Sequence, residues 1–423
     1  MPIDQTLLDD LEWRGLLAHT TDRDALQQAL SAGSVRFYVG FDPTAPSLHL
    51  GNLVQILTAK RLQDAGHTPY ALVGGATGMI GDPRDSGERT LNDAGTVSDW
   101  VGKVRRQIEP FLSFEGDNAA TMVNNLDWTQ GLSTIDFLRD VGKHFPVNRM
   151  LARETVKRRL EAGGISYTEF SYVLLQSMDF LNLYREHGVT LQFGGSDQWG
   201  NITGGAELIR RAAGGTAHAF ATPLITKSDG TKYGKSEGGA LWLDPAMLSP
   251  YSFFQFWLNV EDEKIGELLR IFTFLPRAEI EALEAEHAEK PFLRAGQKAL
   301  AEHVTTLVHG AEETAQVQRA SAALFGGGDM DGLSGDTLGA ALQEAGVTTV
   351  PRAELPSVVD LLVATGLAKS KGEARRTVTE GGAYLNNVRV ADVEQVPGEA
   401  DLVGGRWLVL RKGKKSFRGV EVD

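Results

Sequence analysis

The 423-residue sequence predicts an α/β fold with a parallel sheet, followed by an α-helical region and a small α+β module. Two short apolar runs, 36–41 and 70–74, are bounded by glycine or proline, and a helical pattern lies between them. Strands joined by a helix of this length pair in parallel with a right-handed crossover. Because ligands of such sheets bind at the carboxyl ends of the strands, the first half of the chain has the organisation of a nucleotide-binding domain.

The later elements are predicted from the same apolar spacings. The helix between the first two strands starts after Pro46-Ser47 and stops near Gly66. The elements expected beyond it are helices at 97–112, 133–160 and 167–187, a strand at 191–193 that runs into two glycines, and a mainly helical region at 249–320.

A compact α+β module is expected at the end of the chain. Residues 326–350 open with three glycines and carry scattered Asp, Ser and Thr, so they are the best candidate for a linker, although 336–346 also fits a short helix. Beyond the linker, 356–382 predicts two short helices and 383–411 alternates as strands do.

Composition and charge exclude several classes of protein. The absence of cysteine removes disulfides, thiol catalysis and thiolate metal sites, and the nine histidines show no metal-ligand spacing, so no protein-bound metal is expected. Without a long apolar run or a basic, apolar start, we expect a cytoplasmic protein with no membrane partner. The net charge is −13, yet 403–423 is basic, which indicates either a local site for a polyanion or a solvated tail.

The first candidate for chemistry is the glycine-rich segment GTKYGKS at 230–236. It is not a P-loop, because Asp229 stands where glycine is required and no helix is predicted after it. Two lysines and a hydroxyl on a mobile loop can close over phosphates as negative charge leaves a reacting centre. A solvated lysine-rich turn is the alternative.

The second candidate is the first turn of the helix after Ser47, which carries His49 and Asn52 on one face. Free N–H groups and the helix dipole favour phosphate there, and Gly51 lets a ligand approach the backbone. The alternative is a histidine that only caps the helix.

The third candidate is a polar stripe of Tyr172, Gln176 and Asp179 on one face of the helix at 167–187. It either faces solvent or lines a cavity and binds a small polar ligand. Two glycine-rich turns, 74–78 with Asp82 nearby and 194–201, also allow backbone to approach a ligand.

These motifs resemble those of a known family. HLGN at 49–52 resembles the HIGH signature of class I aminoacyl-tRNA synthetases, and KYGKS at 232–236 resembles their KMSKS signature. The runs FYVGFDPT at 37–44, LVGGATGMIGDP at 72–83, TEFSYVLLQ at 168–176 and GGSDQWGNIT at 194–203 are similar to bacterial tyrosyl-tRNA synthetases. The similarity spans essentially the whole chain.

The resemblance implies a reaction and its partners. The family activates L-tyrosine with ATP, accompanied by Mg²⁺, and transfers the tyrosyl group to the 3′ end of tRNA(Tyr). The family is dimeric, so a homodimer is expected, with Tyr167 near the subunit contact. Adenylation needs no general base, because the attacking carboxylate is already ionised, so catalysis would consist of placement and charge stabilisation.

The resemblance also assigns site residues by position. The residues that match the tyrosine-binding set are Tyr38, Asp82, Tyr172, Gln176, Asp179 and Gln198. Those that match the ATP-binding set are Gly40, Asp42, His49, Gly51, Gly195, Asp197 and Lys235. Those expected to act in catalysis are Thr44, His49, Asn52, Lys232, Lys235 and Ser236. Those expected to hold tRNA are Arg411, Lys412, Lys414 and Lys415.

Domain limits follow from the resemblance as well. They are a Rossmann-like catalytic domain at 1–225, the lysine loop with an α-helical domain at 226–325, the linker at 326–350, and at 351–423 an RNA-binding domain similar to that of a small-subunit ribosomal protein.

Several positions depart from the family's commonest pattern. Asn52 replaces the last histidine of HIGH, and Val39 and Met178 replace a frequent cysteine and tyrosine. A lysine usual in the loop at 84–89 is missing, with Arg84 or Arg89 as candidate replacements.

Two other functions were weighed. A tryptophan-specific synthetase is disfavoured because Tyr38 and Asp179 together suit a phenol. A catalytically silent RNA-binding paralogue is disfavoured because His49, Lys232 and Lys235 are all present.

Overall fold

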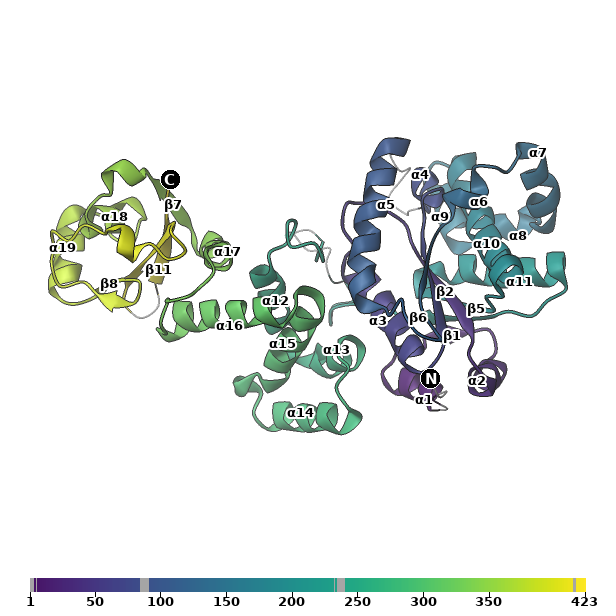
Figure 1. Ribbon diagram of the computed structural model, residues 1–423, viewed down its shortest axis with the longest axis horizontal. Helices are drawn as coiled ribbons and strands as arrows, with labels where there is room; N and C mark the ends of the chain where they lie inside the picture. Colours follow the sequence, from purple (N-terminus) through teal and green to yellow (C-terminus); the bar gives the residue numbers. More distant parts are fainter. Residues whose placement is uncertain (1–3, 5, 84–90, 232, 234–239, 414–415) are drawn as a thin grey trace. The chain divides into compact units, whose positions relative to one another are not determined.

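The computed structural model describes residues 4, 6–83, 91–231, 233, 240–413 and 416–423. The chain forms two compact units, one made of 1–244 and 261–291 and the other of 245–260 and 292–423 (Figure 1). Each unit contains one β-sheet. Across the described ranges no helix is both long enough and apolar enough to cross a bilayer.

The sheet of the first unit has six strands in the order β1-β6-β5-β2-β3-β4. Its strands are β1 (His19–Thr20), β2 (Arg36–Phe41), β3 (Thr68–Val73), β4 (Thr121–Asn124), β5 (Leu191–Gly195) and β6 (His218–Thr222). Neighbouring strands are parallel except for the β1–β6 pair. Because β2 has β3 on one side and β5 on the other, the strand order reverses at β2, which is where such sheets bind ligands.

Most helices of the first unit lie between or beside these strands, and α13 and α14 follow the last strand (Figure 1). They are α1 (Leu7–Trp13), α2 (Arg23–Ala32), α3 (Leu50–Asp64), α4 (Thr77–Ile80), α5 (Ala94–Ile108), α6 (Leu126–Thr129), α7 (Thr134–Asp136), α8 (Val147–Leu151), α9 (Glu154–Ala162), α10 (Tyr167–His187), α11 (Trp199–Ala213), α13 (Ile265–Phe272) and α14 (Arg277–Glu289). Ser166 starts α10 by accepting from the Glu169 N–H, and Gly188 ends it in the left-handed conformation that favours glycine.

The core of the first unit packs α10 against the sheet. Leu72, Val173, Met178 and Phe180 belong to one buried cluster with Tyr38. The strands β2 and β3 and the helix α10 therefore share the side chains that position the polar stripe of α10 at the sheet.

Most predicted elements of the first unit are confirmed, including the strand at 36–41 and the helix at 167–187. The single helical pattern at 133–160 is not, because the chain there divides into α7, a π-helix at Phe137–Val141, a 3-10 helix at Gly142–His144, α8 and α9. Pro146 precedes α8, and a proline interrupts a continuing helix because it lacks an N–H and clashes with the preceding turn.

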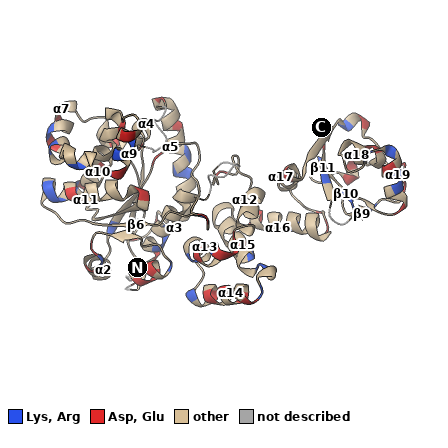
Figure 2. Cartoon of the chain, turned by 180° about the vertical axis from the view of Figure 1, so that it is seen from behind, with Lys and Arg blue, Asp and Glu red and all other residues tan. Residues whose placement is uncertain are grey.

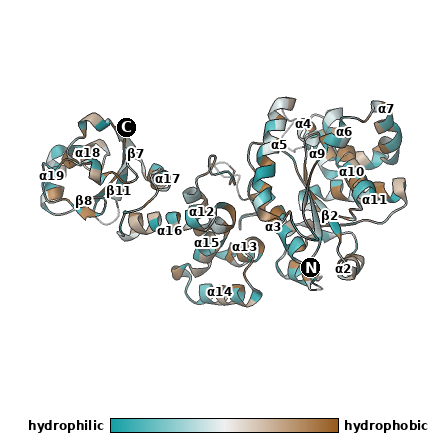
Figure 3. Cartoon of the chain, viewed as in Figure 1, coloured by the Kyte–Doolittle hydropathy of each residue, from teal (hydrophilic) through white to brown (hydrophobic). Residues whose placement is uncertain are grey.

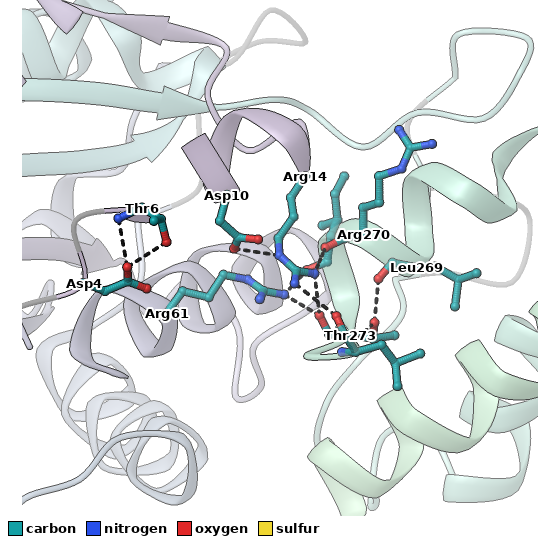
Figure 4. A network of polar contacts seen from close by, with 10 residues as sticks. Asp4, Thr6, Asp10, Arg14, Arg61, Leu269, Arg270 and Thr273 are labelled. Atoms are coloured by element: carbon teal, nitrogen blue, oxygen red, sulfur yellow. Dashed lines mark hydrogen bonds and ion pairs between the residues drawn. The ribbon is translucent and has the colours of Figure 1, made fainter. Parts of the chain in front are cut away.

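Two buried arginines fasten the helix α13 to α1 and α3 (Figure 4). Arg14 donates to the carbonyls of Arg270 at 3.1 Å, Thr273 at 3.3 Å and Leu275 at 3.1 Å, and Arg61 donates to the carbonyl of Thr273. Cationic donors at the end of a helix satisfy carbonyls that have no partner inside it. Burial, and then the charge of Arg14, lower the pKa of Arg61 to about 9.

The outer helix α14 contrasts with this buried contact. It carries several glutamates (Figure 2) and is largely hydrophilic along its length (Figure 3). Ile280 is its one buried residue. This pattern is that of a surface helix held by a narrow apolar stripe.

The second unit joins helices to a five-stranded sheet in the order β7-β11-β10-β8-β9. Its elements are α12 (Pro250–Leu258), α15 (Ala295–His309), α16 (Ala311–Gly326), α17 (Gly335–Ala345), β7 (Val347–Val350), α18 (Val358–Ala364), α19 (Lys371–Thr379), β8 (Ala383–Leu385), β9 (Val388–Arg389), β10 (Trp407–Lys412) and β11 (Ser416–Val422). The helices α18 and α19 and the strands after them agree with the two helices and strand pattern expected at 356–411.

The segment 326–350, expected to be a linker, contains α17 and β7, and α17 confirms the short helix that was the alternative at 336–346. Glycines permit close packing on both sides of this contact: a Cβ on Gly339 of α17 would lie 2.5 Å from the Trp407 ring, and one on Gly419 of β11 would lie 2.8 Å from Leu342 Cβ. The strand β7 pairs in parallel with β11. Hence α17 and β7 are part of the C-terminal fold, and a boundary at 350 would cut through it.

Candidate active site

The candidate active site lies at the carboxyl ends of β2, β3 and β5. Tyr38 stands on β2, Gly74 follows β3, and Gly194-Gly195 end β5. Tyr38 is paired in register with Tyr70 of β3 and with Gln192 of β5. Segments that are far apart in the sequence therefore meet at one edge of the sheet.

At one end of the site a phenol and a carboxyl group are buried together. Tyr38 is 1% exposed and Asp179, from α10, is 2% exposed. The Tyr38 O–H donates to the backbone carbonyl of Gln176 at 3.4 Å, and its ring packs edge-on against Phe180. Burial, and then the charge of Asp179, raise the pKa of Tyr38 above its ordinary value. Tyr38 therefore stays a neutral hydrogen-bonding group.

Asp179 is held by two side chains that the sequence analysis did not single out. Asn125 Nδ2 donates to one carboxyl oxygen at 3.0 Å and Trp128 Nε1 donates to the other at 2.8 Å. Burial raises the pKa of Asp179 to about 7, although these two hydrogen bonds act to lower it. Near neutral pH the group can thus either accept a hydrogen bond from a phenol or donate one.

Asp42 connects the predicted tyrosine-binding and ATP-binding residues. Its carboxylate accepts from the Tyr172 O–H at 2.6 Å and from Thr77 Oγ1 at 2.6 Å. A Cβ on Gly74 would lie 2.1 Å from Asp42 Oδ1, so this position requires glycine. Burial, and then the charge of Asp42, raise the pKa of Tyr172 above its ordinary value. The structure thus places Asp42, predicted to bind ATP, directly against a residue predicted to bind tyrosine.

Asp82 and Gln198 form the opposite end of the site. Gln198 Nε2 donates to Asp82 Oδ2 at 2.8 Å, and Asn201 Nδ2 donates to Asp82 Oδ1 at 3.1 Å. The structure therefore brings together a carboxylate suited to an ammonium group and an amide suited to a carboxylate. Tyr172 lies near both aspartates, because the charges of Asp42 and Asp82 both act to raise its pKa.

Two buried amide oxygens also belong to this region. Gln176 Oε1 and Gln192 Oε1 have no hydrogen-bond partner among the described residues. A hydrogen bond from the Gln192 side chain lowers the pKa of Tyr38, opposing the effect of burial. Buried acceptors without partners are uncommon in proteins, and a ligand that carries N–H or O–H donors would satisfy them.

The HLGN motif caps the helix α3. His49 Nδ1 accepts from the Gly51 N–H at 3.1 Å, and Asn52 Oδ1 accepts from the His49 N–H at 3.0 Å. This is the capping contact that was weighed against phosphate binding, and the two side chains fix the geometry of the first turn. The His49 ring also lies against Trp242, with 6.3 Å between the ring centroids.

The chain that leaves the lysine loop is hydrogen-bonded to this motif. Leu50 N–H donates to the carbonyl of Leu241 at 3.0 Å, and Leu243 N–H donates to the carbonyl of Leu48 at 2.9 Å. The HIGH-like segment and the C-terminal flank of the KMSKS-like segment are therefore neighbours. Lys232, Lys235 and Ser236 themselves lie outside the described residues.

The other residues predicted to act on ATP stand on or just after β2, in the first turn of α3 and just after β5. Gly40, Thr44, Gly51 and Asp197 are exposed. A Cβ on Gly195 would lie 2.7 Å from Asp197 Oδ1, which explains why glycine suits this position. Their predicted contacts with ATP remain predictions.

The basic residues near the end of the chain are less exposed than the sequence indicated. Arg411 is 7% exposed and donates from Nη2 to the carbonyl of Leu324 at 2.6 Å, and burial lowers its pKa. Lys412 Nζ donates to Glu373 Oε1 at 2.6 Å. Arg411 therefore caps the C-terminal end of α16 here, which is a structural contact. Lys414 and Lys415 lie outside the described residues.

Four residues of the site were missed from sequence, namely Asn125, Trp128, Gln192 and Asn201. Asn201 lies in the GGSDQWGNIT run, so its place in a ligand turn could have drawn attention to it. Asn125 and Trp128 follow β4, at the same edge of the sheet as the other site residues. Among the described residues, no cluster of His, Asp or Glu could hold a metal ion.

Known proteins match this chain over nearly its whole length. Residues 30–326 match the family described as tRNA synthetases class I (W and Y), and residues 342–420 match the tyrosine--tRNA ligase SYY-like C-terminal domain. The chain is 61% identical to the tyrosine--tRNA ligase of Streptomyces coelicolor, covering 98% of this chain and 99% of the relative. It is 59% identical to that of Kineococcus radiotolerans, covering 98% of each.

A solved structure agrees with these relatives. A C-terminally truncated mitochondrial tyrosyl-tRNA synthetase from Coccidioides posadasii aligns with a TM-score of 0.66 and 31% identity, covering 74% of this chain and 91% of that one. This chain therefore belongs to the class I tRNA synthetases, and within them to the tyrosine--tRNA ligases.

Proposed function

We propose that this protein activates L-tyrosine with ATP and transfers the tyrosyl group to the 3′ end of tRNA(Tyr). The relatives are named tyrosine--tRNA ligases, and their identity extends over 98% of this chain. A cytoplasmic location is proposed as well, because these relatives are bacterial proteins.

The observation that carries the proposal is that groups complementary to each part of tyrosine gather at one edge of the sheet. Tyr38 and Asp179 form a buried end that suits a phenol, and Asp82 and Gln198 form an end that suits an ammonium and a carboxylate. Tyr172 and its partner Asp42 connect the two ends. Phenylalanine has no hydroxyl to hydrogen-bond with Tyr38 and Asp179, so each contact that tyrosine makes and phenylalanine lacks would cost about 1–3 kcal/mol.

Adenylation would proceed by placement and charge stabilisation. The substrate carboxylate attacks the α-phosphate, a carboxylate–phosphorus bond forms, and the bond to pyrophosphate breaks. The loop lysines Lys232 and Lys235, with Ser236, are proposed to bind the pyrophosphate as its negative charge grows. His49, Asn52 and Thr44 are proposed to face the phosphates, with Mg²⁺ arriving as part of the ATP substrate.

In the second step a ribose hydroxyl of tRNA attacks the tyrosyl carbonyl and AMP leaves. The C-terminal module is proposed to bind the tRNA through exposed basic residues. Lys371 and Arg375 are exposed on α19, where the cartoon in Figure 2 is partly blue for Lys and Arg. Lys414 and Lys415 are proposed to contribute as well, whereas Arg411 is not, because its guanidinium is buried against α16.

We also propose a homodimer that uses the face formed by α7 to α10. Large hydrophobic side chains are exposed on this stretch of the chain. They are Ile135, Leu138, Val147, Leu151, Leu160 and Tyr167. A concentration of exposed apolar side chains is typical of a surface that binds another protein.

Exchange of labelled pyrophosphate into ATP tests the proposed function. Tyrosine should drive exchange, and phenylalanine and tryptophan should not. Exchange driven by tryptophan would identify a tryptophan-specific synthetase instead. No exchange with any amino acid would favour a catalytically silent RNA-binding protein. Sedimentation velocity of the wild type and Tyr167→Glu tests the dimer.

A further inference from the structure

A chain of side-chain hydrogen bonds begins at Arg153 and ends at Asp82. Arg153, the residue just before α9, donates from Nη1 to Asn201 Oδ1 at 2.8 Å and from Nη2 to the carbonyl of Gly200. Asn201 Nδ2 donates to Asp82 Oδ1 at 3.1 Å and to Gln198 Oε1 at 3.0 Å. Gln198 Nε2 completes the chain by donating to Asp82 Oδ2 at 2.8 Å.

The donor at one end of this series of hydrogen bonds and the acceptor at the other allow the two amide groups between them only one orientation. A guanidinium can only donate hydrogen bonds, and an ionised carboxylate can only accept them. Asn201 must therefore direct its oxygen to Arg153 and its nitrogen to Asp82. Because that nitrogen also donates to Gln198 Oε1, Gln198 is held with its own nitrogen toward Asp82.

The surroundings make this orientation energetically important. Asn201 is 8% exposed, so a reversed amide would leave buried groups unpaired or facing like groups. Burial lowers the pKa of Arg153, and the charge of Asp82 acts in the opposite direction. The attraction between the two charges thus helps to keep the guanidinium protonated inside the site.

We propose that Arg153 is a positioning residue that acts through Asn201 to hold the N–H groups of Gln198 toward the carboxylate of the amino-acid substrate. This inference rests on the proposed function. Without Arg153, the Asn201 oxygen loses its donor, and Asp82 alone is left to orient the Asn201 and Gln198 amides. Gln198 is then held less firmly with its N–H groups toward the substrate carboxylate, so the substrate would bind more weakly.

Two ligands separate this role from general support of the fold. L-Tyrosine carries the phenol, the ammonium and the carboxylate, whereas tyramine lacks the carboxylate. Binding of each to the full-length chain is measured by calorimetry without tRNA, for the wild type, Arg153→Met and Arg153→Lys. Arg158→Met is the matched control, because Arg158 is an exposed arginine on α9 itself.

In Arg153→Met we expect tyrosine to bind about tenfold more weakly, as for one lost charge-assisted contact, and tyramine to change by less than about twofold. Arg153→Lys should recover part of the loss, and the control should match the wild type. Equal weakening of both ligands, or no weakening of either, would overturn the inference.

A second variant covers the case in which Arg153→Met does not fold. Asn201→Leu removes the amide that links Arg153 to Gln198 and should produce the same selective loss of tyrosine binding. An unchanged ratio of the two affinities in this variant would contradict the inference while leaving the proposed function intact. Failure of the wild type to bind tyrosine would instead contradict both this inference and the proposed function.

Discussion

Asp179→Asn should change how stability depends on pH, because Asp179 is a buried carboxyl group. Burial raises its pKa from 3.8 to about 7. The unfolded chain therefore ionises this group first, so its contribution to stability falls as pH rises from about 4 to 7 and is constant above that range. At about 1.4 kcal/mol per unit, this shift destabilises the folded state by on the order of 4 kcal/mol above pH 7.

Asparagine cannot ionise, so the variant loses this dependence. Its amide nitrogen must face either Asn125 or Trp128, both of which donate to Asp179 in the wild type. That conflict between donors costs about 1–3 kcal/mol at every pH. The free energy of unfolding of the variant relative to the wild type should therefore rise by about 3 kcal/mol between pH 5 and pH 8.

Urea unfolding of the full-length chain, followed by tryptophan fluorescence at pH 5, 6, 7 and 8, measures this difference. Asp127→Asn serves as the control, because Asp127 is exposed on the neighbouring helix α6 and should show no such trend. A stability difference between Asp179→Asn and the wild type that is the same at pH 5 and pH 8 would refute the reasoning. It would mean that the buried carboxyl group ionises as readily as an exposed one.

Three further predictions concern other parts of the chain. Burial lowers the pKa of fully buried His67 to about 4, so the contribution of this residue to stability should fall by up to about 3 kcal/mol between pH 6.5 and pH 4, opposite in sign to that of Asp179. Thermal melts should therefore show His67→Gln gaining stability relative to the wild type as pH falls over this range. Gly74→Ala forces a methyl group onto Asp42 and should lower tyrosine-dependent pyrophosphate exchange at least tenfold, with normal exchange as the contrary result. Deleting 328–423 should preserve exchange and abolish tRNA charging, whereas deleting only 351–423 should give a poorly soluble protein, because it leaves α17 and β7 without their sheet.

The first half of the fold could be predicted because local pattern and topology agree there. The apolar runs at 36–41 and 70–74 bracket a helical period, and that combination has few alternatives. The segment 326–350 was predicted to be a linker from its three opening glycines and scattered polar residues, and its alternative, a helix at 336–346, is confirmed by α17. Glycine often signals flexibility in a sequence, but Gly339 permits contact with Trp407 in the structure. Local composition does not distinguish these two uses of glycine.

The candidate site residues were predicted from motifs, but the side chains that hold them in place were not. Asp179 belongs to a polar stripe that periodicity reveals, whereas Asn125 and Trp128 reach it from a segment about fifty residues away. Such partners depend on tertiary geometry that no local pattern encodes. The same applies to Arg411, whose basic character indicated RNA but whose guanidinium is buried against the end of α16.

A crystal structure of the full-length protein with L-tyrosine would test the central claim most directly. The phenol oxygen should lie within hydrogen-bonding distance of both Tyr38 and Asp179, with the ammonium at Asp82. A tyrosine bound in the reverse direction, or bound away from these residues, would contradict the account.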